Sequence, residues 1–402
     1  MAALIRGSGL DALACSLRLS QLAIHHYWSP TREPGGHFRG FTVSCSQLKL
    51  SDLGMVLLEP GTSESETSSF ESYLGEQGTE SKKFFSSLMS WLEAGTGFVL
   101  ENHPVYTIFR GRRFEDYFIG DSLAVLSSLN PHELRTIRHE LTTIAAAGHA
   151  ITATTRAVED ASLGAALDRS LGSTLANVMF GSYLEAFPGV RKIPLQLHRQ
   201  VWIPMYWTQS VAEKITSGLQ PFSEAQFSAP KGFNVAQLVR TMADKALSSP
   251  YRHVVNPREK PGSVLDFPAR SVKRVLNIEF ALVHFCVAGD IKRSTFFLAD
   301  TPRGVTRITL SPSGPTEPGT TAPSLLASVE IPLRNSTRTN EELREAAKAA
   351  IREVGGRPLC VGVVKRVPFG YGASADGPSD LGGSSLNDNL LRGLGAAGGI
   401  RL

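Results

Sequence analysis

The chain has 402 residues and a formal net charge of only +4, so it is long enough for two or three domains and is neither strongly basic nor strongly acidic overall. Its apolar content of 42% is ordinary for a globular protein, and no apolar run approaches the roughly 18–20 residues that cross a bilayer. The four cysteines (Cys15, Cys45, Cys286 and Cys360) form no Cys-x-x-Cys pair, which argues against a cysteine zinc site or a disulfide framework and favours a reducing compartment, the cytoplasm.

The first 22 residues predict a helix that docks on the rest of the chain. Leu10, Leu13 and Leu17 follow helical spacing, and Ser8 with Asp11 three residues later fits a helix cap. A presequence for the mitochondrial matrix is the alternative, although such segments carry more arginine and no acid. We expect no strand before Gly7-Ser-Gly9, so these glycines are not assigned to a phosphate-binding loop.

Residues 1–120 are expected to form a mixed α/β N-terminal region. Strands are predicted at 41–50, 55–58 and 98–109, and a helix at 82–93. Between them, residues 60–81 are rich in serine and glutamate. They offer too little apolar surface to offset the entropy of ordering, which predicts a mobile acidic loop.

Residues 121–250 are expected to be mainly helical. The clearest signal combines Asn130 as a cap, Pro131 at the first helical position and Glu133 closing a capping box. A helical pattern continues with interruptions to Phe187, and a further helix is predicted at 234–247.

Residues 270–370 predict an antiparallel sheet with one helix. The strands are expected at 272–288, 291–299, 305–310, 324–333 and 359–367, with a helix at 339–354. Residues 371–402 are rich in glycine and serine and predict a flexible tail. The expected fold class is therefore α+β: a mixed N-terminal region, a helical middle and a C-terminal antiparallel sheet with one packed helix.

The sequence contains no motif that predicts a catalytic residue, a metal ligand or a cofactor site. The ten histidines form no His-Glu-x-x-His pattern, and no carboxylate completes a known ligand spacing. The chain has no Gly-x-Ser-x-Gly nucleophile elbow, and Leu171–Leu175 lacks the lysine of a Walker loop.

Charge is segregated along the chain. Eight acids and two bases lie between Glu59 and Glu101, whereas thirteen bases and six acids lie between Lys231 and Arg307. Such poles steer a polyanion to one face or favour head-to-tail self-association.

Two basic groups are candidates for nucleic-acid binding. The stretch Phe109–Phe118 combines arginines, which bind phosphate, with aromatic rings, which stack on bases; the alternative is a turn at Gly111 with solvated arginines and buried rings. The second group follows the C-terminal sheet, where edge protection is the alternative. The candidate residues are Arg110, Arg112, Arg113, Lys273, Arg274, Lys292, Arg293, Arg303 and Arg307.

One short stretch resembles a known family. Val99–Ile108, followed by Arg110, is similar to the strand-turn segment of octanoyl/lipoyl transferases. The glycine-rich segment and the catalytic Cys and Lys residues of that family do not follow in order here.

These observations favour a non-enzymatic assembly and nucleic-acid-binding protein that self-associates and prefers RNA to DNA, such as a viral nucleoprotein, capsid or accessory protein found in the virion. The alternatives are an enzyme of unknown type, including an acyl transferase, and a purely structural protein without nucleic acid.

Overall fold

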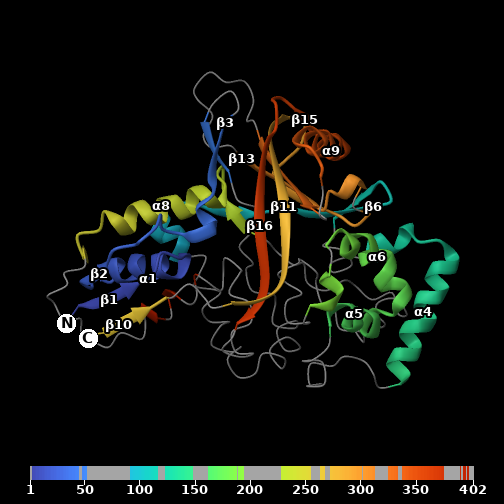
Figure 1. The fold of residues 1–402 in the computed structure, drawn as a ribbon, viewed down its shortest axis with the longest axis horizontal. Coiled ribbons are helices and arrows are strands. Elements are labelled where there is room, and N and C mark those ends of the chain that lie inside the picture. Colours follow the sequence, from blue (N-terminus) through green and yellow to red (C-terminus); the bar gives the residue numbers. More distant parts are fainter. Residues whose placement is uncertain are drawn as a thin grey trace.

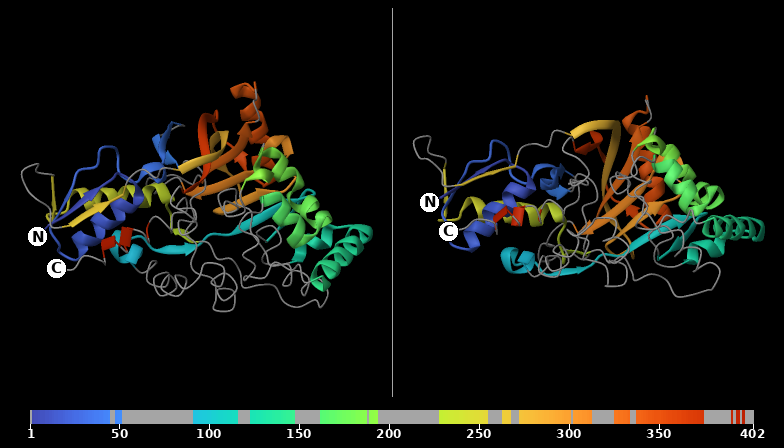
Figure 2. Two further views of the ribbon diagram at one scale, coloured as in Figure 1. Left: turned by 60° about the horizontal axis from the view of Figure 1, so that its bottom comes forward. Right: turned by 90° about the horizontal axis from the view of Figure 1, so that it is seen from below.

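The computed structural model describes residues 2–44, 48–51, 91–115, 123–147, 162–187, 189–193, 228–254, 263–267, 272–300, 302–312, 325–333, 337–374, 390, 393–394 and 396–397. Figure 2 shows an elongated molecule, with the N-terminal unit and helix α4 at opposite ends and a large sheet between them.

The N-terminal unit is a small parallel sheet covered by helices. Strand β1 (Ala3–Arg6) leads through a tight turn into helix α1 (Leu10–Gln21) and then into strand β2 (His26–Trp28). Strands β10 (Ser263–Asp266) and β9 (Arg252–His253) complete the order β10-β1-β2-β9, in which every pair is parallel. Helix α8 (Val235–Leu247) packs against α1 (Figure 1).

The apolar face of α1 fixes this unit. Leu10, Leu13 and Leu17 are buried as their spacing predicts, and they share one core with Trp28 of β2 and the buried face of α8. The C-terminal segment also enters this core, through Leu390, Leu394 and Ala397. Residues from both ends of the chain therefore stabilise the same small unit.

The second sheet has eight strands among the residues described. Its order is β15-β11-β14-β13-β12-β6-β7, and β16 pairs with β11. The strands are β6 (Val105–Phe109), β7 (Arg112–Phe114), β11 (Val272–Ala288), β12 (Ser294–Leu298), β13 (Arg307–Pro312), β14 (Leu325–Leu333), β15 (Arg357–Pro358) and β16 (Val363–Ser374). All neighbours are antiparallel except β6 and β12, which are parallel.

Helices cover both faces of the large sheet. Helix α9 (Asn340–Glu353) packs on one face, and α4 (Pro131–Ala146), α5 (Leu163–Leu171) and α6 (Ser173–Ala186) pack on the other (Figure 1). The alternation along β11 explains this arrangement, since Phe280 and Leu282 face α6 while Ala281 and Val283 face α9.

Smaller elements complete the described chain. They are the hairpin β3 (Phe41–Ser44) and β4 (Leu48–Ser51), the pair β5 (Leu100–Asn102) and β8 (Ser228–Pro230), and the short helices η1 (Gly36–Arg39), η2 (Leu123–Ser128), η4 (Val190–Lys192) and η6 (Pro302–Gly304). No helix in the described ranges is both long enough and apolar enough to cross a membrane.

The expected α+β class is wrong. The N-terminal unit is a parallel β-α-β arrangement, and β6 from the N-terminal region joins the predicted C-terminal sheet in parallel, so the fold is α/β with a large mixed sheet. Local patterns do not reveal which distant strands pair, and this is why the class was missed. The predicted acidic loop at 60–81 lies outside the described residues.

Candidate functional site

The turn between β1 and α1 is built on Gly7. Its φ is +134°, a region that favours glycine, and a Cβ there would lie 2.6 Å from the carbonyl oxygen of Phe267. That Cβ would also be 3.3 Å from the Cβ of Ala12, which is fully buried. The indole Nε1 of Trp28 donates to the carbonyl oxygen of Gly7 at 2.9 Å. The small residues at 7 and 12 therefore allow strand, helix and neighbouring loop to approach closely.

Gly9 caps helix α1 with its backbone alone. Its φ of −71° and ψ of 176° place it outside the helix, and no side chain caps the first turn at this position. The first N–H groups of a helix lack partners within the helix and carry a partial positive charge, so they attract anions.

Gly7, Gly9 and Ala12 follow the spacing Gly-x-Gly-x-x-Ala, directly after a strand and at the start of a helix in a β-α-β unit. This is the arrangement in which a dinucleotide places its diphosphate on the helix start. The expectation that no strand precedes these glycines is wrong, because β1 lies directly before them. The missed signal is Ala3–Arg6, four residues that form β1.

The loop after β2 lies against this turn. The Ser8 hydroxyl is 3.4 Å from that of Thr31 and accepts a hydrogen bond from the backbone N–H of Arg32 at 3.2 Å. The N–H of Gly35 donates to the carbonyl oxygen of Ser8 at 3.1 Å. These contacts hold residues 31–35 beside the carboxyl end of β1, where ligands of open α/β sheets bind.

Two acidic positions depart from the dinucleotide-binding pattern. The pattern has an acid about 20 residues beyond the glycines that binds the ribose, but Trp28 ends β2 and the first acid after it is Glu33. The second departure is Asp11, whose carboxylate lies at the start of α1, where its Oδ1 accepts a hydrogen bond from the N–H of Ala12 at 2.8 Å. A Cβ on Gly9 would lie 2.5 Å from that oxygen. The backbone thus fits a diphosphate, while Asp11 occupies part of the space for it.

Cys15, one turn further along α1, is not a candidate nucleophile. Burial, and to a lesser extent the charge of Asp11, raise the pKa of its thiol to about 12. Within the described part of the chain, no three His, Cys, Asp or Glu side chains gather to hold a metal ion.

A row of buried polar side chains crosses the large sheet. The row consists of successive cross-strand partners: Thr295 on β12, Thr309 on β13, Ser328 on β14 and His284 on β11. The hydroxyl of Thr295 donates to that of Thr309 at 3.4 Å, and Ser328 Oγ is 3.0 Å from His284 Nδ1. Burial is the main cause that lowers the pKa of His284 to about 3, so its ring is neutral at neutral pH.

His103 extends this row toward the N-terminal unit. Arg293 Nε donates to its Nδ1 at 3.1 Å, so the ring proton is on Nε2, which lies 2.9 Å from Thr295 Oγ1. Burial, with a smaller effect of Arg293, lowers the pKa of His103 to about 3. Arg293 also reaches Glu101 of β5 at 3.3 Å and the carbonyl oxygen of Phe233 at 3.2 Å. These bonds tie the β5–β8 pair to the large sheet.

The predicted basic residues are divided between surface and interior. Arg307 is buried and pairs with Glu330 across β13 and β14. Lys292 and Arg303 are exposed, and Arg303 adopts a positive φ of 55°. Arg112 and Arg113 are exposed on β7, and Arg113 lies 5.1 Å from the centre of the Tyr106 ring.

Lys273 and Arg274 are in β11, opposite Ala373 and Gly372 of β16; their side chains are outside the described part. They were expected on a strand adjacent to Lys292 and Arg293, but β14 and β13 separate β11 from β12. The stripe predicted from these four residues does not form on adjacent strands.

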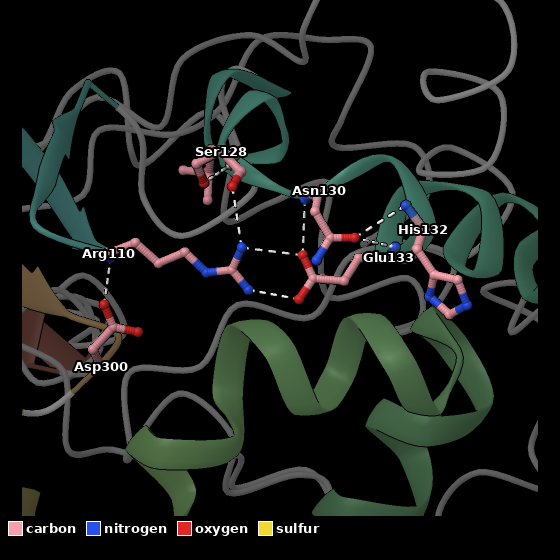
Figure 3. A network of polar contacts seen from close by, with 7 residues as sticks. Arg110, Ser128, Asn130, His132, Glu133 and Asp300 are labelled. Carbon is pink, nitrogen blue, oxygen red and sulfur yellow. Dashed lines mark hydrogen bonds and ion pairs between the residues drawn. The ribbon is translucent and has the colours of Figure 1, made fainter.

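Arg110 joins the β6–β7 hairpin to the start of α4 (Figure 3). Its guanidinium makes two bonds to Glu133, at 2.6 and 3.0 Å, and one to the carbonyl oxygen of Ser128 at 3.1 Å. Its backbone N–H donates to Asp300. Glu133 also accepts from the N–H of Asn130 at 2.9 Å, which confirms the predicted capping box. Arg110 is therefore engaged within the protein.

Two solved structures that are similar to this chain are enzymes. A reduced UDP-galactopyranose mutase is similar to the chain with a TM-score of 0.59 and 12% identity, over 98% of this chain and 94% of its own. Wild-type putrescine oxidase bound to putrescine has a TM-score of 0.50 and 12% identity, over 99% of this chain and 98% of its own. No protein-family model matches the chain, and no curated protein sequence matches it either.

This likeness corrects the expected function. The prediction of a non-enzymatic nucleic-acid-binding or viral structural protein is wrong, because nearly the whole chain follows the fold of these enzymes. The alternative, an enzyme, agrees better with the fold.

Proposed function

We propose that this chain is an oxidoreductase-type enzyme that binds an adenine dinucleotide at the β1–α1 turn, of the flavin class. The observation that carries the proposal is the Gly7-x-Gly9-x-x-Ala12 turn inside a parallel β-α-β unit. The fold supports the proposal. One similar structure is a UDP-galactopyranose mutase in its reduced state, and the other is putrescine oxidase, an enzyme whose cofactor binding has been redesigned.

The residues of the N-terminal unit have distinct roles in this proposal. The first turn of α1, with the N–H groups of Leu10 and Asp11, would hold the diphosphate, and Gly9 would let it approach the backbone. Ser8, Thr31 and Arg32 would border the adenosine side. When bound, the flavin supplies the electron-accepting ring, while the protein binds and orients it.

Binding of flavin adenine dinucleotide (FAD) to the purified chain tests the proposal. We expect saturable binding that ADP displaces and that riboflavin, which lacks the adenosine diphosphate half, does not. Gly9→Ala should weaken it, because the new Cβ enters the diphosphate space. The φ of −71° suits alanine, but this Cβ would lie 2.5 Å from Asp11 Oδ1, so the melting temperature of the variant must verify that it is folded. Gly181→Ala in α6 is the matched control, since a Cβ there meets nothing within 4 Å.

The proposal fails if ADP-displaceable binding is absent both from the wild-type chain and from a variant with a neutral side chain at position 11. It also fails if Gly9→Ala and Gly181→Ala bind equally well.

A further inference from the structure

We propose that Asp11 is an affinity-limiting residue of the dinucleotide site: its carboxylate occupies the place of a phosphate, and removing it makes the site bind adenosine diphosphates more tightly. This inference rests on the proposed function and concerns the same site. It identifies which ligand chemistry the wild-type turn disfavours, namely a diphosphate that adds negative charge beside a fixed carboxylate.

The Asp11 carboxylate already occupies part of the space that a phosphate would need. A phosphate at a helix start binds the N–H groups of the first turn. One of these groups, the N–H of Ala12, already donates to Asp11 Oδ1 at 2.8 Å. The same oxygen would be 2.5 Å from a Cβ on Gly9, so it fills the open side of the glycine whose role is to let the diphosphate approach.

Asp11 cannot easily move away from the turn. Asp11 is only 7% exposed, and the C-terminal segment lies directly on its backbone. At Gly393 an added Cβ would be 2.2 Å from the carbonyl oxygen of Asp11, and Leu390 and Leu394 are buried in the core that holds α1. The first turn of α1 is therefore held from behind while its carboxylate faces the turn at Gly9.

The charge of Asp11 also disfavours a bound diphosphate. An acid in the first turn stabilises an isolated helix through the helix dipole. A diphosphate would use the same dipole, so ligand and carboxylate compete for one partial positive charge and repel each other at short range. The chain lacks the ribose-binding acid at the end of β2, but this does not reduce the repulsion between Asp11 and a diphosphate, because the Asp11 charge lies at the start of α1.

Three variants separate occupancy from charge. Asp11→Asn keeps an oxygen that can accept from Ala12 but removes the charge, and Asp11→Ala removes both. Asp244→Asn is the matched control, because it removes an equal charge from an exposed position on α8, the helix that packs on α1. Melting temperatures of the unliganded variants verify that each is folded.

The experiment is a calorimetric titration of the full chain and each variant with ADP and with FAD. We expect Asp11→Ala to bind ADP at least about tenfold more tightly than the wild type, a change of about 1.4 kcal/mol. Asp11→Asn should show a smaller gain, and Asp244→Asn should match the wild type. Raising the salt concentration should narrow the gap, since salt screens the repulsion.

Three outcomes would overturn the inference. If wild type and both Asp11 variants bind ADP equally, Asp11 does not limit affinity, and the proposed function stands. If folded Asp11→Asn binds more weakly than the wild type, the carboxylate assists the ligand, and again the site itself is upheld. If no protein binds ADP or FAD, both proposals are wrong.

Discussion

Arg110 offers a test of how a single side chain connects the hairpin to the helical layer. Arg110 and Gly111 are the two central residues of the β6–β7 turn, with φ of 51° and 69°, a combination that suits glycine or asparagine far better than arginine. The guanidinium binds Glu133 through two bonds, and the two side chains are 39% and 21% exposed. Arg110 therefore combines a strained backbone conformation with a two-bond ion pair to Glu133.

The two effects have opposite signs. A partly exposed pair with this two-bond geometry contributes about 1 kcal/mol, the upper end of surface pairs. A left-handed conformation at a residue other than glycine costs about 1 kcal/mol. We therefore expect Arg110→Ala to lower the free energy of unfolding by about 1 kcal/mol, because it loses the ion pair with Glu133 and keeps the backbone strain. Arg110→Gly should be about 1 kcal/mol more stable than Arg110→Ala.

Urea unfolding of Arg110→Ala, Glu133→Ala and the double variant yields the coupling energy of the pair. Arg110 lowers the pKa of the Glu133 carboxyl, so this stabilisation is present above the ordinary carboxyl pKa and disappears as pH falls through the lowered value in the folded state. Arg112→Ala, on the exposed strand β7, is the control and should have little effect. A glycine variant less stable than the alanine variant, or a coupling near zero at neutral pH, would refute this reasoning.

Three further changes probe the interior. Arg307→Met should lower the free energy of unfolding by roughly 3–5 kcal/mol in urea, because it leaves the Glu330 carboxyl buried without its cation, and adding Glu330→Leu should recover much of the loss. Stability should fall as pH drops from about 6.5 toward 3, since the pKa values of His103 and His284 are lowered to about 3 and only the unfolded chain takes up their protons in this range; His103→Asn should remove the His103 part of that dependence in acid titrations followed by circular dichroism. Gly393→Ala should reduce the melting temperature, since its Cβ would lie 2.2 Å from the carbonyl oxygen of Asp11.

Several local signals in the sequence were reliable, but two were wrong. The cap expected at Ser8 is wrong because Gly9 is the N-cap of α1, and the single strand expected at 41–50 is the hairpin of β3 and β4. The capping box of Asn130 and Glu133 marked the start of α4, and the 17-residue strand β11 and the helix α8 lie where their patterns place them. Each signal depends on neighbours a few residues apart, so it survives without knowledge of the fold.

Pairing between distant strands was not accessible in the same way. The short strand β1 has little pattern of its own, and its partner β10 is about 260 residues away in the chain. Because β1 was missed, the glycines at 7 and 9 lost the context that gives them meaning. Likewise, the sequence marks Arg293 and Arg307 only as basic, whereas the fold turns them inward to Glu101 and Glu330.

The composition of the N-terminal core has a consequence for synthesis on the ribosome. Strand β1 is synthesised long before its partner β10, which begins at Ser263, and the residues that cover α1 include Leu390 and Leu394. At elongation rates of about 5–20 residues per second, the apolar face of α1 would wait roughly 20–80 s for its last contacts. During that interval the nascent chain exposes an amphipathic helix and unpaired strand edges, which are the surfaces that chaperones bind.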